Sequence, residues 1–143
     1  MHLIAVVAFD GVVPFDLATP CEVFGRTHLA DGREAYRVRV CGTKRVVDAG
    51  PFALQCRYGL AELSGADTVL VPGISDIDRP LPAALLDALR AARARGARIV
   101  SICTGAFLLA AAGLLAGKRA TTHWLAAPEL APPLPAPIAS FTF

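Results

Sequence analysis

Three short apolar runs limit what this sequence can fold into. They cover residues 3–9, 68–71 and 98–102, and their apolar side chains are nearly continuous where a half-buried strand would alternate. Such runs are typical of strands covered on both faces, as in a parallel sheet. Helix-like segments at 16–29 and 82–95 separate them. This alternation of strand and helix predicts an α/β fold with a mostly parallel central sheet.

The predicted fold is a flavodoxin-like, three-layer sandwich with helices on both faces of the sheet. We expect residues 5–7, 69–71 and 99–101 to form adjacent central strands because their apolar character is continuous. Residues 36–41 alternate between polar and apolar side chains, which predicts a more exposed strand. Residues 46–56 contain two short apolar runs around a turn, and this pattern predicts a hairpin.

The length of 143 residues is that of one domain. We predict that residues 1–125 form it. Residues 126–143 are rich in proline, which favours a tail without a long helix or a central strand. Hydrophobic residues make up 55% of the chain. Its apolar stretches are interrupted before they reach the ~20 residues of a bilayer span. With no leader-like start, we expect a cytoplasmic protein that does not contact membranes.

The charge pattern does not favour nucleic-acid binding. The formal net charge is only +2, whereas a DNA-binding domain normally carries a basic stripe. One cluster of basic residues lies on or just after the second helix-like segment and comprises Arg90, Arg93, Arg95 and Arg98. We interpret this cluster as a solvated helix face. The chain alone is therefore not expected to bind DNA.

The four cysteines are not spaced as metal ligands, since no two form a C-x-x-C pair and no histidine stands at zinc-finger spacing from them. We predict no metal site and no cofactor. Cys41 and Cys56 lie in strand-like runs, where a cysteine is typically a small buried hydrophobe. Cys103 has a different setting.

Residues 101–106 (SICTGA) carry the strongest indication of chemistry. A predicted buried strand leads directly into Cys103, followed by small residues and a helix expected over 104–115. This is the pattern of a nucleophile elbow, in which a sharp turn presents a reactive side chain. The start of a helix also favours a thiolate. The alternative, that Cys103 only fills a crevice, remains open at this point.

A nucleophile that attacks a carbonyl-like carbon needs donors for the oxyanion that develops. The backbone N–H of Thr104 is one candidate. Gly73 is another, because it ends a buried strand and only glycine allows such a close backbone approach. An ordinary strand-ending turn is the alternative reading of Gly73.

Four motifs follow one another at residues 16–20 (DLATP), 71–73 (VPG), 103–105 (CTG) and 121–124 (TTHW). Together they resemble the PfpI-like branch of the class I glutamine amidotransferase-like superfamily, which includes deglycases, isonitrile hydratases and PfpI-type proteases. The residues around the first and third motifs resemble those of the amidase-like N-terminal domain of AraC-type transcriptional regulators. The resemblance covers about residues 3–124.

The resemblance implies a role for each matched residue. Cys103 would be the elbow cysteine, and Asp16 the acidic residue that hydrogen-bonds its thiol. Gly73 and Thr104 would supply the oxyanion hole. His123, 20 residues after the cysteine, matches a histidine that deglycases carry near theirs. The resemblance also implies a homodimer that binds a small-molecule ligand.

The sequence departs from the family's pattern at two places. Thr104 stands where PfpI-type proteases have a histidine, so peptidase activity is not expected. The chain also stops before the strands and helix that follow in the family and has no helix-turn-helix, so we expect an incomplete domain.

Three functions stay open. The first is an amidase-like ligand-sensing domain of an AraC-type regulator without its DNA-binding half. The second is an isonitrile hydratase-like or other small-molecule hydrolase or lyase. The third is a deglycase- or glyoxalase-like stress protein.

Overall fold

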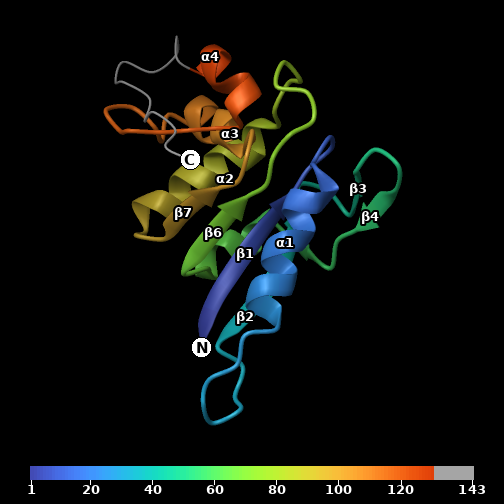
Figure 1. Cartoon of the computed structure of the whole chain (residues 1–143), viewed down its shortest axis with the longest axis vertical. Coiled ribbons are helices and arrows are strands. Elements are labelled where there is room, and N and C mark those ends of the chain that lie inside the picture. Colours follow the sequence, from blue (N-terminus) through green and yellow to red (C-terminus); the bar gives the residue numbers. More distant parts are fainter. Residues whose placement is uncertain (131–143) are drawn as a thin grey trace.

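A parallel five-stranded sheet forms the centre of the computed structural model, which describes residues 1–130 (Figure 1). Each neighbouring pair of strands runs in the same direction. In spatial order the strands are β5 (Tyr58–Gly59), β2 (Tyr36–Gly42), β1 (His2–Ala8), β6 (Thr68–Val71) and β7 (Arg98–Ser101). The predicted α/β fold with a mostly parallel sheet is confirmed.

Helices flank this sheet. Helix α1 (Pro14–Gly25) packs against β1 and β2, and α3 (Gly105–Ala111) packs against β6 and β7. Helix α2 (Ala83–Ala94) lies against β7 and the 3-10 helix η1 (Leu60–Gly65). The described chain ends in η2 (Trp124–Ala126) and α4 (Ala127–Leu130), which lie near α3 in Figure 1. Within residues 1–130, no helix has both the length and the apolar character to cross a bilayer.

The continuous apolar strands form the core, as expected. Val6 in β1 and Val69 in β6 are completely buried. Helix α2 contributes Leu85 and Leu89, both 0% exposed, because residues four apart share one face of a helix. Leu86 is half-buried and packs against the margin of this core, since it lies about 100° round the helix from Leu85.

One strand is not where the sequence predicted it. β1, β6 and β7 are adjacent, but β7 forms an edge of the sheet described by residues 1–130. Its residues Ile99 to Ser101 are half-buried, in contrast to the fully buried β6. The prediction failed because apolar side chains indicate that the faces of a strand are covered. They do not indicate how many strands pair with its edges.

Two helices differ in length from the prediction. Helix α1 starts at Pro14, where proline fits the first helical turn, and it ends at Gly25 rather than near residue 29. Helix α3 ends at Ala111, four residues before the predicted end at Leu115. Gly113 adopts a φ of +74°, a left-handed conformation that stops a helix.

The predicted hairpin is confirmed as a separate antiparallel pair, β3 (Val46–Asp48) and β4 (Ala53–Gln55). The division into a domain at 1–125 and a tail at 126–143 stays a prediction. Residues 127–130 form the short helix α4, and residues 131–143 lie outside the described part of the chain.

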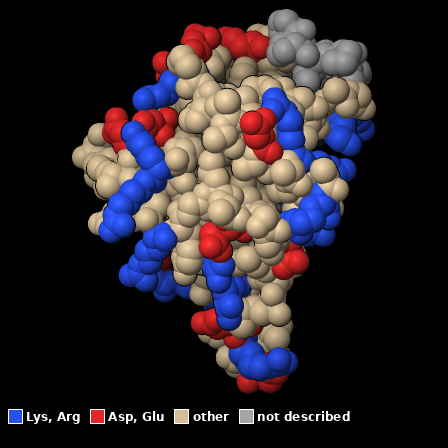
Figure 2. Space-filling model, turned by 180° about the vertical axis from the view of Figure 1, so that it is seen from behind, with Lys and Arg blue, Asp and Glu red and all other residues tan. Residues whose placement is uncertain are grey.

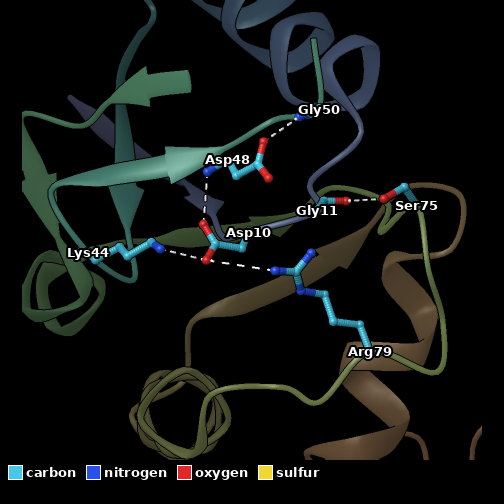
Figure 3. A network of polar contacts seen from close by, with 7 residues as sticks. All are labelled: Asp10, Gly11, Lys44, Asp48, Gly50, Ser75 and Arg79. Atoms are coloured by element: carbon cyan, nitrogen blue, oxygen red, sulfur yellow. Dashed lines mark hydrogen bonds and ion pairs between the residues drawn. The ribbon is translucent and has the colours of Figure 1, made fainter. Parts of the chain in front are cut away.

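Asp10 attaches this hairpin to the end of β1 (Figure 3). Its Oδ1 accepts a hydrogen bond from the backbone N–H of Asp48 at 2.8 Å. Its Oδ2 pairs with Lys44 Nζ at 2.6 Å and lies 3.9 Å from Arg79 Nη2. The Asp48 amide and Lys44 hold the pKa of Asp10 below its ordinary value. A charged carboxylate therefore joins the two sheets.

Replacing Asp10 by Asn keeps an acceptor for Asp48 but removes the charge. We expect Asp10→Asn to lower the free energy of unfolding by about 1 kcal/mol near pH 7. Since folding lowers the pKa of Asp10, its contribution is present above the ordinary carboxyl pKa and is lost as the pH falls through the lower folded value. The difference from the parent protein should therefore shrink below about pH 4.

Urea unfolding at a series of pH values measures this difference. Asp78→Asn is the control, because the Asp78 carboxylate makes no ion pair within residues 1–130. A difference between Asp10→Asn and the parent that grows toward acid pH would contradict the role assigned to Asp10.

Candidate functional site

Cys103 stands in a strained turn between β7 and α3. Its φ is +54°, and it is the one non-glycine residue with positive φ among residues 1–130. A left-handed backbone at such a residue costs on the order of 1–3 kcal/mol and must be held by its surroundings. The sharp strand-to-helix turn predicted at this position is therefore present.

Gly105 explains how α3 can start directly after this turn. A Cβ built on Gly105 would lie 2.3 Å from the Val71 carbonyl oxygen and 2.7 Å from that of Pro72. No real side chain fits there, so only glycine allows the first turn of α3 to contact the end of β6. This contact fixes Cys103 beside the segment that contains Gly73.

Asp16 and Gly73 meet across this contact. Asp16 lies in the first turn of α1, is 7% exposed, and accepts a hydrogen bond from the Gly73 N–H through Oδ2 at 3.2 Å. A Cβ on Gly73 would lie 2.4 Å from that oxygen, 2.9 Å from Thr104 Oγ1 and 3.4 Å from Cys103 Cβ. Four of the five predicted site residues, Asp16, Gly73, Cys103 and Thr104, therefore lie together. They meet at the position that a side chain on residue 73 would occupy.

Thr104 has a role that its backbone position did not predict. Its Oγ1 donates to the Ile74 carbonyl at 2.7 Å and accepts from the Ile74 N–H at 2.8 Å. The hydroxyl thus ties the start of α3 to the chain after β6. The backbone N–H of Thr104 makes no hydrogen bond to residues 1–130, so this donor is unoccupied in the described part of the chain. No local sequence pattern predicts these side-chain bonds, because they join residues 30 positions apart.

His123 lies in the same hollow as Cys103 but makes local contacts. Its Nδ1 accepts from the Leu125 N–H at 3.3 Å, and its ring stacks on Trp124 at 6.0 Å between centroids. The residue that joins this segment to the elbow is Thr122, whose Oγ1 donates to the Cys103 carbonyl at 2.9 Å. Thr122 is 6% exposed. The sequence analysis did not predict this role of Thr122, because the resemblance to the family assigned a role only to the neighbouring His123.

A hollow of about 330 Å³ opens beside Cys103, between helix α3, the segment that holds Thr122 and the edge of β7 that pairs with no other strand among residues 1–130. Part of the lining of this hollow is apolar and includes Ile99, Leu109 and Leu115. Arg119 is the one charged side chain among the lining residues. Its lining residues are Ile99, Ser101, Cys103, Ala106, Leu109, Leu115, Arg119, Ala120, Thr121, Thr122 and His123. The volume and mixed lining suit a small organic molecule.

The other three cysteines are held in their thiol form. Burial, and secondarily the charge of Glu62, raise the pKa of Cys41 to about 12. Burial also raises the pKa of Cys21, with a smaller contribution from Glu22, and that of Cys56. Cys41 and Cys56 are buried, as predicted.

Asp16 and Cys103 are neighbours, but the described hydrogen bonds of Asp16 go to Gly73 rather than to the thiol. The predicted thiol–carboxylate bond therefore stays a prediction. Groups of three or more His, Cys, Asp or Glu side chains that could bind a metal ion do not occur within residues 1–130.

The structure is that of an α/β protein in which a parallel sheet leads into a strained turn at Cys103, near the buried carboxylate of Asp16. The chain belongs to the DJ-1/PfpI family, whose model matches residues 2–136.

Among curated proteins, the chain is 35% identical over 134 residues to an uncharacterized protein in the cpoL 5' region of Streptomyces lividans, covering 86% of this chain and 88% of that protein. It is 47% identical over 60 residues to the isonitrile hydratase of Pseudomonas putida, covering 41% and 26%. It is 29% identical over 117 residues to the HTH-type transcriptional regulator GbdR of Pseudomonas aeruginosa, covering 80% and 32%. The match thus spans about a third of the regulator's length.

Solved structures show the same fold. Drosophila melanogaster DJ-1beta matches with a TM-score of 0.76 and 20% identity over 97% of this chain and 75% of that one. An AraC family transcriptional regulator from Pseudomonas putida matches with a TM-score of 0.72 and 21% identity over 100% and 80%. Both the fold and the family agree with the resemblance found in the sequence.

Gly73→Ala should disrupt the meeting point of the four site residues. Its Cβ would overlap the Asp16 carboxylate, so we expect a loss of about 1–3 kcal/mol in the free energy of unfolding. Gly65→Ala is the matched control, since a Cβ there meets nothing within 4 Å. Denaturant unfolding of both variants checks this, and equal stabilities would show that the approach at Gly73 is not tight.

Cys103 should be alkylated faster than Cys41 by iodoacetamide. With a pKa of about 12, Cys41 is about one part in ten thousand thiolate near pH 8 and is also 0% exposed. Cys103 lies on an open hollow. Mass mapping of each cysteine against pH measures the rates, in the parent and in Asp16→Ala.

We expect Asp16→Ala to change the alkylation rate of Cys103, because both side chains lie against Gly73, whereas the control Asp78→Ala should leave this rate unchanged. If Cys103 reacts no faster than Cys41, or if Asp16→Ala leaves its rate unchanged, Cys103 is a packing residue and the predicted pair is wrong.

Proposed function

We propose that these residues act as the amidase-like, ligand-sensing domain of an AraC-type transcriptional regulator, with DNA binding left to a half that the sequence does not include. The small-molecule ligand would occupy the hollow beside Cys103. The observation that carries the proposal is the hydrogen bond from the Gly73 N–H to the Asp16 carboxylate. A site that binds a ligand without converting it does not need this donor to be free.

An oxyanion needs unoccupied donors at the place where its charge develops. The Gly73 N–H already has a carboxylate partner, and that negative charge would repel a second anion. His123 accepts from Leu125 and makes no described bond to Cys103. These hydrogen bonds of Gly73 and His123 favour a ligand-binding site over an assembled catalytic site.

A second function is supported by the 47% identity to an isonitrile hydratase over 60 residues. In that case water adds to the terminal carbon of an isonitrile, R–NC, to give the formamide R–NH–CHO. Cys103 would attack that carbon while Asp16 moves the thiol proton to it, which gives a thioimidate, R–N=CH–S. Water would then add to the same carbon, and the C–S bond would break to release the formamide and the free thiol. The third candidate is a deglycase- or glyoxalase-like activity. Its one support is the similarity in fold to DJ-1beta.

The remaining parts of the proposal concern partners and location. We propose a cytoplasmic homodimer without DNA binding by these residues themselves. On the face in Figure 2, basic and acidic side chains are interspersed around a largely uncharged centre and form no continuous basic stripe. Large apolar side chains on α1 are exposed, Phe15 at 79% and Val23 at 56%, and such residues are frequent where subunits meet.

One experiment separates sensing from catalysis. The protein is incubated with cyclohexyl isocyanide and, separately, with methylglyoxal, and the products are measured by mass spectrometry. The proposal expects no turnover above that of Cys103→Ser. Formation of N-cyclohexylformamide that Cys103→Ser abolishes would establish the hydratase instead, and conversion of methylglyoxal lost in the same variant would establish the third function.

A thermal-shift panel of small amides, amines and carboxylates tests binding directly. We expect at least one compound to raise the melting temperature of the parent and of Cys103→Ser alike. Ala120→Trp should remove this shift because Ala120 lines the hollow and a tryptophan would fill it. Ala94→Trp, at an exposed position of α2 outside the hollow, is the control. If Ala120→Trp responds as the parent does, the ligand does not bind beside Cys103.

A further inference from the structure

A second hollow lies beside β2 and β5, at the other end of the strand order from β7 and Cys103, and three of its lining residues are basic. It has a volume of about 360 Å³ and lies between the chain after β2 and the chain that leads through β5 into η1. Its lining consists of Gly42, Thr43, Lys44, Arg45, Cys56, Arg57, Tyr58, Gly59 and Leu60. Three of these nine residues are cationic and none is acidic. We call this the basic hollow.

The hairpin register brings the cations together. β3 and β4 pair Val46 with Gln55, and one step further the Cys56 N–H donates to the Arg45 carbonyl at 2.8 Å. Arg45 therefore lies opposite Cys56 at the end of the hairpin, and Arg57 follows Cys56 in the chain. In Figure 2, basic side chains lie on the side of the molecule that carries the hairpin, the left in that view, with acidic side chains among them.

Two of the three cations have no counter-charge. Lys44 pairs with Asp10, which lies outside the lining of the hollow. Arg45 and Arg57 make no ion pair with any residue from 1 to 130. Both also line an adjoining hollow of about 590 Å³. Like charges that line the same hollow repel each other, and an anion bound between them would reduce the repulsion.

The floor and one wall of the basic hollow are rigid. A Cβ on Gly42 would lie 2.4 Å from the Lys44 carbonyl oxygen and 2.7 Å from Cys56 Sγ, so the backbones are closely packed there. The Tyr58 ring is covered on one face by the Arg39 guanidinium, 4.9 Å from its centroid, and Arg39 in turn pairs with Glu62. A fixed scaffold lowers the cost of ordering a ligand.

We propose that the basic hollow binds a small molecule that bears a phosphate group. Guanidinium groups match phosphate oxygens through paired N–H donors. A phosphate dianion balances the two unpaired arginines, which a single carboxylate would not. The site lies at the carboxyl end of β2, the edge of a parallel sheet where ligands collect. It is separate from the hollow beside Cys103 and does not depend on the function proposed for that one.

Calorimetric titration with pyrophosphate at about 0.15 M NaCl tests the site, since this salt screens unspecific attraction beyond about 8 Å. We expect saturable one-site binding. Arg45→Ala and Arg57→Ala should each weaken it by about tenfold to a hundredfold, as expected for the loss of a charge-assisted bond. Arg93→Ala, which removes an exposed charge from α2, should bind as the parent does.

Urea unfolding confirms that each variant is folded, which we expect because neither arginine makes an ion pair in the described chain. Absence of saturable binding, or an equal loss in Arg93→Ala, would overturn the proposal. A short single-stranded oligonucleotide is titrated in parallel. If it binds more tightly than pyrophosphate and depends on both arginines, the hollow serves nucleic acid and the small-molecule proposal is wrong.

Discussion

The close packing of α3 against the end of β6 is the contact on which the candidate site depends. It exists because Gly105 and Gly73 have no side chains where a Cβ would lie 2.3 Å and 2.4 Å from oxygen atoms. Their absence lets the Thr104 hydroxyl reach both backbone groups of Ile74. The turn that results forces Cys103 into a left-handed backbone. Strain at one residue is therefore sustained by hydrogen bonds and packing at its neighbours.

The same packing decides which polar groups near Cys103 are free. Asp16 is buried, and a buried carboxylate requires hydrogen-bond partners, which the Gly73 N–H provides. The Thr104 side chain is equally occupied, whereas its backbone N–H is not. A ligand in the hollow would contact Cys103, whereas Asp16, Gly73 and Thr104 lie outside the lining of the hollow. If the Gly73 N–H were to bind an oxyanion, its hydrogen bond to Asp16 would first have to open.

The sequence predicted the strands and the meeting of Asp16, Gly73, Cys103 and Thr104, because apolar runs and turn residues are local patterns and parallel strands bring their carboxyl ends to one edge. It could not predict the edge position of β7, since strand order depends on which segments pair across the sheet. Nor could it find the bond from Thr122 to Cys103, because a hydroxyl gives no periodic pattern. The neighbours of a polar side chain are determined by tertiary packing, which residue spacing does not encode.

The connection from β1 to α1 links the two hollows. Asp10 at its start binds the hairpin that carries Arg45, and Asp16 at its end binds Gly73 beside Cys103. Between them, the Gly11 carbonyl accepts from Ser75, and the Val13 N–H donates to Gly73. β1 is the middle strand of the described sheet and is almost entirely buried. One short connection beside the middle strand therefore carries Asp10 before its start and leads directly to Asp16, so the hairpin and the end of β6 are both attached to the same segment of the chain.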